Sequence, residues 1–476
     1  MAHPEWALMH KTKGTELRLI RGKYYLYEIT SKWDKEAKKT RKITLRQIGT
    51  ITEEHGLVPT GLKKRGRPAS SGSVFNENVF AEIKNESKQK SEKIAPLLNA
   101  CTSIEDMRSE RNQLHSIPEI LFLTLMALIS DADGWQDMET YGNMRTYQLK
   151  EYLDYKHGTP SDDTLRRFFT NLDPSHFKNF FCSLVQPLIK QAQAKLISID
   201  GKVSRHSFDG EEKAIHMVSA FSSEARLVLG QEKVGDKTNE ITAIPKILEW
   251  LDIKNRILTI DAMGCQHAIA DQIVEKGGDY VFSLKGNQGN LSEDVSVYFN
   301  DIELTDGSEK GSSKPAHTTH YTDVDKGHGR IETRACSICL DVAWLQERHP
   351  KWCTIKSIIQ IKSTREMKNT RSTEVRYYIS SLVTDAQEML KNIRSHWAIE
   401  NSLHWVLDMT FHDDASRIRK DNAPQIMAIL RHLVLNALQL YRASLPKSEK
   451  ISIKGLRKMC AWDPSLTEKV VSRLFS

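Results

Sequence analysis

The chain is 476 residues long, with 39% apolar and 27% charged residues, proportions that exclude a disordered chain and a membrane protein. Its longest apolar run, Ile117–Ile129, is too short to span a bilayer. Since single cores stop growing near about 250 to 300 residues, we expect several domains. No apolar signal segment stands at the N-terminus, so we expect a cytoplasmic protein.

Basic residues are concentrated near the N-terminus. The first 70 residues carry 16 Lys and Arg against 7 Asp and Glu, a balance of +9, whereas the other 406 residues sum to −2. This asymmetry is typical of a protein in which one part follows phosphates and another performs chemistry.

The seven cysteines are scattered and do not form a disulfide framework. Cys336 and Cys339 have the spacing of half a zinc site, but no second pair lies at finger spacing. Reduced thiols in a cytosol are the simpler interpretation.

Residues 14–50, within a module predicted to span 1–60, alternate short apolar and polar runs, as in Lys23–Ile29 and Ile43–Gly49, on either side of a turn-like stretch at Trp33–Glu36. This alternation predicts a small, basic β-hairpin module.

Residues 61–93 are too polar to pack a core and are expected to be a flexible linker. The linker contains Arg65-Gly66-Arg67-Pro68, which resembles an AT-hook, a slim segment that lays two arginines in a narrow A·T minor groove. Arg65 and Arg67 are therefore candidate DNA contacts. The alternative is a solvated basic linker.

Helical patterns fill residues 94–195, which we interpret as a DNA-binding or associated helical domain. Pro118 lies in the first turn of a helix from Ile117, and Ser161 is placed to cap a helix over 162–171. Further helices are expected over 135–142 and 176–194.

The pattern changes at Leu196 to short apolar runs. Three strands in succession, followed by alternating strands and helices, describe a mixed sheet with helices packed on it. The expected strands are 196–200, 214–221, 227–234, 257–260 and 280–284, and the expected helices are 240–251 and 265–276.

Three further segments complete the predicted organisation. We interpret 196–289 as the first part of an RNase H-like core, 290–384 as a β-rich insertion, and 385–442, with a helix over His396–Thr410, as the second part of the core. Residues 443–476 are expected to form a C-terminal tail.

Three carboxylates are the candidate catalytic groups. Asp200 and Asp261 end two predicted strands, and the ends of neighbouring strands are where open α/β sheets bind ligands. Glu400 shares a helix face with His404 and Asp408, beside an apolar stripe that can dock on the sheet.

Carboxylates gathered at one place repel one another unless a cation lies between them, and hard oxygen ligands favour Mg²⁺ or Mn²⁺. Two such ions can activate an attacking oxygen and stabilise a leaving oxygen at phosphorus. We therefore expect Asp200, Asp261 and Glu400 to bind two divalent ions for phosphodiester chemistry. Taken singly, an Asp at a strand end usually caps a turn and a helical Glu usually faces solvent.

Several blocks closely resemble the DDE insertion-sequence transposases, most nearly the ISAs-type subgroup with the H-repeat-associated proteins. The resemblance extends from about Ile104 to about Leu438. The matching blocks are Ile199–Lys202 (IDGK), Ile260–Gln266 (IDAMGCQ), Lys285–Gln288 (KGNQ), His328–Arg334 (HGRIETR) and His396–Asp408 (HWAIENSLHWVLD).

The resemblance implies a DNA transposase with an RNase H-like core. Such an enzyme would bind the terminal inverted repeats of its own element, cleave a strand there and direct the freed 3′-hydroxyl at target DNA, as a homodimer that pairs two ends. Related transposases carry a Tyr, an Arg and a Lys around the catalytic Glu, but Ile393, His396 and Leu407 stand at those places here. The phosphate contacts of that triad therefore do not carry over.

Other residues near the carboxylates have two interpretations each. Lys202 lies on the Asp200 side of its strand and can reach a phosphate, or it is a surface lysine. Lys285 and Asn287 resemble a DNA-contacting loop or an ordinary polar turn. His404 stands near the metals or packs its helix.

Asp413 and Asp414 are interpreted as a solvated helix end. Two alternatives to transposition remain, a metal-dependent nuclease that cuts without joining and a DNA-binding regulator derived from a transposase.

Overall fold

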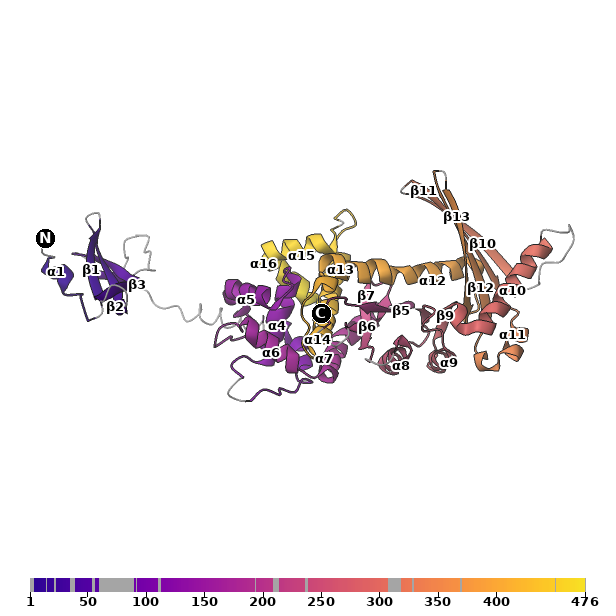
Figure 1. Ribbon diagram of the computed structural model, residues 1–476, viewed down its shortest axis with the longest axis horizontal. Helices are drawn as coiled ribbons and strands as arrows, with labels where there is room; N and C mark the ends of the chain where they lie inside the picture. The colour runs from indigo at the N-terminus through magenta and orange to yellow at the C-terminus, as the bar shows by residue number, and fades with distance from the viewer. Residues whose placement is uncertain are drawn as a thin grey trace. The chain divides into compact units, whose positions relative to one another are not determined.

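The computed structural model describes residues 4–13, 15–20, 23–34, 39–53, 56–59, 90, 92–109, 113–192, 194–208, 214–235, 239–306, 318–327, 329–368, 370–449 and 451–475. The chain divides into two compact units, Met1–Val79 and Phe80–Ser476 (Figure 1). The AT-hook-like Arg65 and Arg67 lie outside the described residues. Among the described helices, none is long and apolar enough to cross a membrane.

The first unit contains a four-stranded antiparallel sheet, two strands more than the predicted hairpin. Its strand order is β1-β2-β3-β4, so each strand pairs with the next in the sequence. A small core of Ala7, Leu17, Leu26 and Ile51 closes one face. The elements are α1 (Glu5–Leu8), β1 (Thr15–Ile20), β2 (Lys23–Asp34), β3 (Lys39–Thr52) and β4 (Gly56–Pro59).

The second unit opens with helices in the predicted helical segment. Pro118 lies in the first turn of its helix, and Ser116 and Glu119 cap that helix reciprocally. Ser161 caps the next predicted helix by accepting a hydrogen bond from the Thr164 amide at 3.3 Å. The helices are α3 (Ala95–Cys101), α4 (Ile117–Ile129), α5 (Trp135–Leu149), α6 (Asp162–Asn171) and α7 (Pro174–Ala192).

The predicted C-terminal tail is folded. Helices α15 (Ile453–Trp462) and α16 (Pro464–Val471) follow the long α14 (Ala423–Ala443) and pack on it and on α4. Apolar side chains of both helices, including Leu456 and Val470, are fully buried. Short amphipathic helices with side-chain caps therefore complete the helical core instead of trailing from it.

A nine-stranded mixed sheet forms the rest of the second unit, in the order β10-β11-β12-β13-β9-β8-β5-β6-β7. Strands β5, β8 and β9 are parallel, whereas β6 and β7 run antiparallel to their neighbours. These five strands have the arrangement predicted for an RNase H-like core. They are β5 (Leu196–Val203), β6 (His216–Ser222), β7 (Leu227–Lys233), β8 (Ile257–Ile260) and β9 (Asp279–Leu284).

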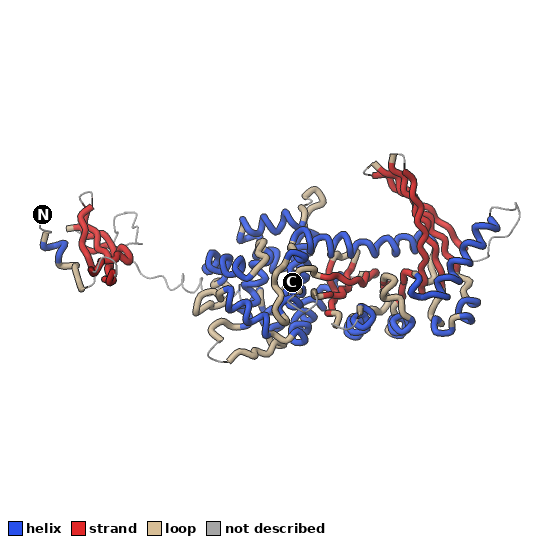
Figure 2. Tube along the Cα trace, in the orientation of Figure 1, coloured by secondary structure: helices blue, strands red, loops and turns tan. Residues whose placement is uncertain are grey.

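The region predicted as a β-rich insertion begins with helix α10 (Gly289–Asp306) and then extends the central sheet. The continuity arises because β13 pairs antiparallel with β9 through Tyr377–Ser380. The strands are long and continue beyond the end of α12 (Figure 2). They are β10 (Thr318–Gly327), β11 (Arg330–Cys339), β12 (Ser357–Met367) and β13 (Thr370–Ser380), with α11 (Ala343–Arg348) between β11 and β12.

Helices cover both faces of the central sheet. Helices α8 (Glu240–Trp250) and α9 (His267–Glu275) lie along one side, and α12 (Ala386–Ile399) lies along the other (Figure 1). Helix α12 packs on β5 and β8 and continues through a π-helical turn, Glu400–His404, into α13 (Trp405–Thr410). The helix predicted from His396 therefore begins ten residues earlier, at Ala386.

Candidate active site

The two candidate aspartates lie on neighbouring parallel strands. Ile199 of β5 is in register with Ile260 of β8, so Asp200 and Asp261 are the next residues on each strand. Strand β8 ends there, whereas β5 continues to Val203 against β6. Both carboxylates therefore reach the same edge of the sheet, as the sequence predicted.

Helix α12 brings the third carboxylate to the same place. Asp200, Asp261 and Glu400 all line one cavity of about 320 Å³, whose wall also includes Lys285. The π-helical turn begins at Glu400, and such turns insert an extra residue and are frequent at functional sites. Glu400 lines this cavity, while His404, expected on the same face, lines a neighbouring one.

Negative charge is concentrated at this cavity. Burial is the main reason that the pKa of Asp200 is raised to about 7, and the charges of Asp261, Glu240 and Glu400 raise it further. Burial and Glu240 likewise raise the pKa of Asp261, against the opposite effect of hydrogen bonds from the Gly264 and Met263 amides and of the Lys285 charge. A site of this kind is suited to a cation.

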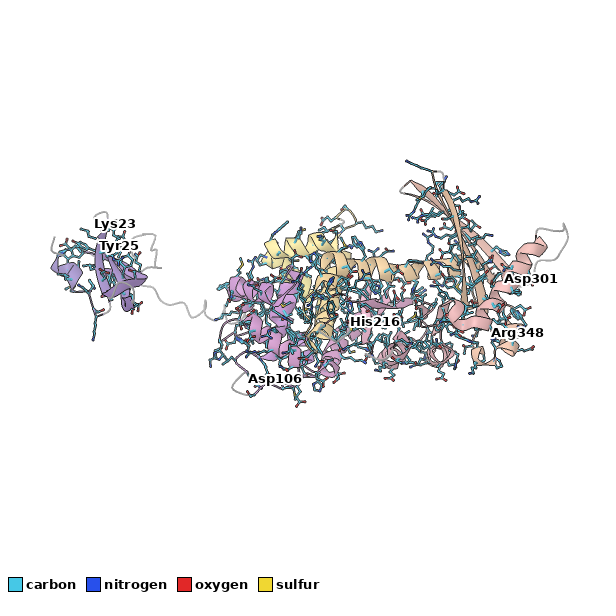
Figure 3. All side chains as sticks on the ribbon, in the orientation of Figure 1. Lys23, Tyr25, Asp106, His216, Asp301 and Arg348 are labelled. Atoms are coloured by element: carbon cyan, nitrogen blue, oxygen red, sulfur yellow. The ribbon has the colours of Figure 1, made fainter. Side chains whose placement is uncertain are left out.

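Glu240 is a fourth carboxylate that the sequence analysis missed. It is the first residue of α8, and its Oε1 lies 3.0 Å from Nε2 of His216 on β6, which is labelled in Figure 3. Glu240 and His216 are far from both aspartates in sequence, and neither belongs to a recognisable motif. Only the fold brings them together.

Gly201 stands close to this pair. A methyl group at position 201 would come too near the Glu240 carboxylate and the His216 ring, so the ends of these side chains would have to move. We expect Gly201→Ala to lower the free energy of unfolding by about 1 kcal/mol, measured by urea denaturation, because the Glu240–His216 pair must shift. The control is Gly327→Ala, where the added methyl group meets open space. Equal urea midpoints for the two variants would contradict the expectation.

Lys202 is engaged by carboxylates of this chain. Its Nζ lies 2.6 Å from Asp408, 3.2 Å from Asp414 and 3.9 Å from Asp413, and its side chain is only 11% exposed. These contacts favour a structural role over the predicted phosphate contact.

Asp413 is not at a solvated helix end. It is almost fully buried, where it receives a hydrogen bond from Ser204 at 2.6 Å and one from Arg431 at 2.5 Å. Ligand atoms of Asp408, Asp413 and Asp414 lie within 4.8 Å of one another, a spacing that suits a metal ion. However, Lys202 already supplies a positive charge to all three, so we interpret this cluster as an ion-pair network. The carboxylate oxygens of Asp200, Asp261 and Glu400 are farther apart, because among the described residues only the Asp408 cluster has its ligand atoms all within 4.8 Å of one another.

The loop after β9 braces the loop that carries Asp261. The side-chain amide of Asn287 donates to the Ala262 carbonyl at 2.6 Å, and that of Gln288 donates to the Cys265 carbonyl at 2.7 Å. Asn287 is therefore committed to a contact within the chain. Lys285 is exposed and faces the cavity.

Two histidines near the carboxylates, His396 and His404, are neutral. Burial lowers the pKa of His396 to about 4, and Nδ1 of His396 lies 2.9 Å from the Thr259 hydroxyl. Burial also lowers the pKa of His404 to about 3, and Nδ1 of His404 lies 3.6 Å from Asp200. Neither ring supplies positive charge to the site.

Cys336 and Cys339 are both buried. Burial raises the pKa of the Cys336 thiol to about 12, and Cys339 Sγ lies 2.9 Å from the Tyr298 hydroxyl. Burial of both thiols in the sheet core favours reduced cysteines over a zinc site.

Two aspartates carried by the neighbouring strands β5 and β8, with a helical glutamate at the same cavity of an RNase H-like sheet, are the arrangement expected of an enzyme of phosphodiester chemistry. The family model described as "Transposase DDE domain" matches residues 191–437, and the model "DDE_Tnp_1-associated" matches residues 98–185. The chain belongs to the DDE transposase family and is a DDE-type enzyme.

Curated relatives agree with this assignment. "Putative transposase YncI" of Escherichia coli O157:H7 is 40% identical over 80% of this chain and 95% of its own length. "H repeat-associated putative transposase YhhI" of Escherichia coli K12 is 37% identical over 76% of this chain and 93% of its own length. The piggyBac transposase synaptic complex with hairpin DNA covers 82% of this chain and 78% of its own, at 13% identity and a TM-score of 0.39, a likeness too weak to add to the assignment.

Proposed function

We propose that this transposase binds the terminal inverted repeats of its own element, hydrolyses a DNA strand at each end and joins the freed 3′-hydroxyl to target DNA. The observation that carries the proposal is the single cavity shared by Asp200, Asp261 and Glu400. A second copy of the chain would hold the other end. The basic N-terminal residues, with Arg65 and Arg67, would add contacts to DNA.

The family implies divalent metal, and the donor set fits it. Asp200, Asp261 and Glu400 are hard oxygen ligands for Mg²⁺ or Mn²⁺, and the raised pKa of Asp200 reflects acidic neighbours as well as burial. When bound, two such ions supply charge stabilisation to the attacking and leaving oxygens. The protein would hold the aspartates on adjacent strands, position Asp261 through the braced loop and attract a phosphate with Lys285.

The test uses labelled duplexes made from the genomic flanks of the reading frame, with Mg²⁺, Mn²⁺ or a chelator. We expect metal-dependent nicking at the repeat boundary, followed by joining of the 3′ end to a second duplex. Hydrolysis without joining of a pre-cleaved end would instead identify a nuclease. Binding without cleavage in either metal would identify a DNA-binding regulator.

Metal should stabilise the protein in a pH-dependent way. Because the pKa of folded Asp200 is about 7 against an ordinary value of 3.8, ionising Asp200 destabilises the metal-free protein as pH rises from about 4 to 7. Below that window the penalty is absent, and above it the penalty is constant. We expect Mn²⁺ to raise Tm by a few degrees at pH 8 and by less at pH 5.5.

Thermal melts at both pH values, with chelator and with Mn²⁺, measure this difference. Asp200→Asn removes the titrating charge and should flatten the pH dependence of the metal-free protein while abolishing most of the Mn²⁺ effect. If wild type and Asp200→Asn lose the same stability between pH 5.5 and 8, Asp200 does not titrate as described.

A further inference from the structure

Two arginines of the HGRIETR motif and a third arginine from β12 surround one glutamate outside the catalytic cavity. Arg330, Glu332 and Arg334 are two residues apart on β11, so their side chains lie on one face of the sheet. Arg365 of β12 is directly opposite Glu332 in the register. Nε of Arg330 lies 2.8 Å from the Glu332 carboxylate and Nε of Arg365 lies 3.6 Å from it, while Arg334 forms a further ion pair with it.

This cluster has a surplus of positive charge. One carboxylate faces three guanidinium groups, so Glu332 neutralises only part of their charge. Two of the arginines are substantially exposed, with 37% of the Arg330 side chain and 48% of the Arg365 side chain accessible. Glu332 thus holds Arg330, Arg334 and Arg365 side by side, a cluster that we call the arginine fan. Their remaining positive charge can pair with another anion.

The arginine fan lines a groove of about 880 Å³. Arg376 and Arg394 also line it, but Arg376 pairs with Glu374 at 2.8 Å and Arg394 pairs with Asp323 at 2.5 Å. The hydroxyl side chains along the groove are hydrogen-bond donors suited to phosphate oxygens. They are Ser363, Thr364, Ser372 and Thr373.

The groove lies directly beside the catalytic cavity. The two share Arg376 and Trp397 among their lining residues. The Arg376 guanidinium stands 5.1 Å from the Trp397 ring centroid, and Trp397 is one turn before Glu400 and 41% exposed. The groove lies between strands β11 to β13 and helix α12, which lines it with Ile393 and Ala398.

We propose that this groove binds the sugar-phosphate backbone of duplex DNA next to the bond that is cut, with Arg330, Arg334 and Arg365 pairing with backbone phosphate and Glu332 positioning them. With a volume of about 880 Å³ the groove has room for more than one phosphate group, and it shares lining residues with the cavity of the three carboxylates. The inference rests on the proposed function and adds a DNA-binding surface to it.

The test measures binding of a labelled duplex of arbitrary sequence to the full chain in chelator, over a range of salt concentrations. Contacts to phosphate do not depend on the DNA sequence, so a duplex of arbitrary sequence can be used. Binding is the readout, and no cleavage is needed. The double variant Arg330→Gln/Arg365→Gln should bind on the order of tenfold more weakly, and its slope of log K against log salt should be flatter by about one to two units.

Arg348→Gln is the matched control, because Arg348 is an exposed arginine paired with Asp294 at 2.7 Å and does not line the groove (Figure 3). It should leave affinity and slope unchanged. Arg330→Lys/Arg365→Lys keeps the charge and should restore most of the slope, which a folding defect would not do.

Neutral methylphosphonate linkages locate the contact. Replacing phosphates beside the cleavage position should weaken binding by wild type and have little further effect on the Gln variant. A Gln variant that keeps wild-type affinity and slope would overturn the groove proposal even if wild type cleaves element ends. Conversely, the Gln variant could have a flattened salt slope while wild type cleaves no element end. That result would support the groove proposal and contradict the proposed transposition.

Discussion

Asp200→Asn, Asp261→Asn and Glu400→Gln are each expected to slow metal-dependent strand cleavage by about 10³-fold or more while DNA binding persists. Each change replaces a carboxylate, the proposed metal ligand, by an amide of nearly the same shape. The carboxylates line one cavity, so the loss of any one would remove a proposed ligand from the same site. Single-turnover cleavage of labelled element ends measures the rate, and a filter-binding assay measures DNA affinity.

The control for these variants is Glu347→Gln, an exposed carboxylate on α11 outside the cavity. It should cleave at the wild-type rate. Undiminished cleavage by any one triad variant would remove that residue from the site. Loss of binding together with loss of cleavage would show that the carboxylate acts through folding or DNA affinity.

The placement of the two aspartates on neighbouring strands could be predicted because local patterns carry the information. Apolar runs ending at Asp200 and Asp261 identify strands, and strand ends in a mixed sheet meet at one edge. The parallel pairing of β5 with β8 confirms that geometry. The motif blocks then added Glu400, which no periodic pattern distinguishes from a solvated helical glutamate.

The partners of Lys202 could not be predicted in the same way. Alternation along β5 places Lys202 on the side of Asp200, but it does not show that three carboxylates more than 200 residues later will surround it. Asp413 was misinterpreted for the same reason, since Arg431 reaches it from α14. Long-range ion pairs leave no trace in local periodicity.

Helix geometry limited the prediction around Glu400. An ideal helix puts Glu400 and His404 on one face, but the π-helical turn between them changes the angular offset. The sequence predicted a β-rich insertion but left open how it joins the core, because β-rich composition does not show which strand will pair with β9. Edge pairing through Tyr377–Ser380 made it part of the sheet.

Arg457→Met is expected to lower the free energy of unfolding by about 3 to 5 kcal/mol, because it removes a buried charge from its partners. The Arg457 side chain is fully buried in α15. Its guanidinium donates to the carbonyls of Leu128 at 3.0 Å and Ala132 at 3.1 Å, and also to that of Thr410. It therefore ties the C-terminal helices to the end of α13.

Two aspartates and an aromatic ring complete the surroundings of Arg457. Asp131 and Asp133 each lie 3.2 Å from the guanidinium, and the Phe411 ring centroid lies 4.3 Å from it. Methionine fills much of the volume but satisfies none of the carbonyls, so the loss is of hydrogen bonds and charge rather than of packing. Because α13 continues the helix of Glu400, cleavage should fall together with stability.

Urea denaturation followed by circular dichroism measures the effect, with Arg167→Met as the control. Arg167 forms an exposed ion pair with Asp163 on α6, its side chain is 73% accessible, and such pairs contribute about 0.5 kcal/mol. Arg457→Lys keeps the charge but not the several directed donors, and should fall between wild type and Arg457→Met. If Arg457→Met unfolds at the same urea concentration as Arg167→Met, the C-terminal helices do not depend on Arg457 for their place in the core.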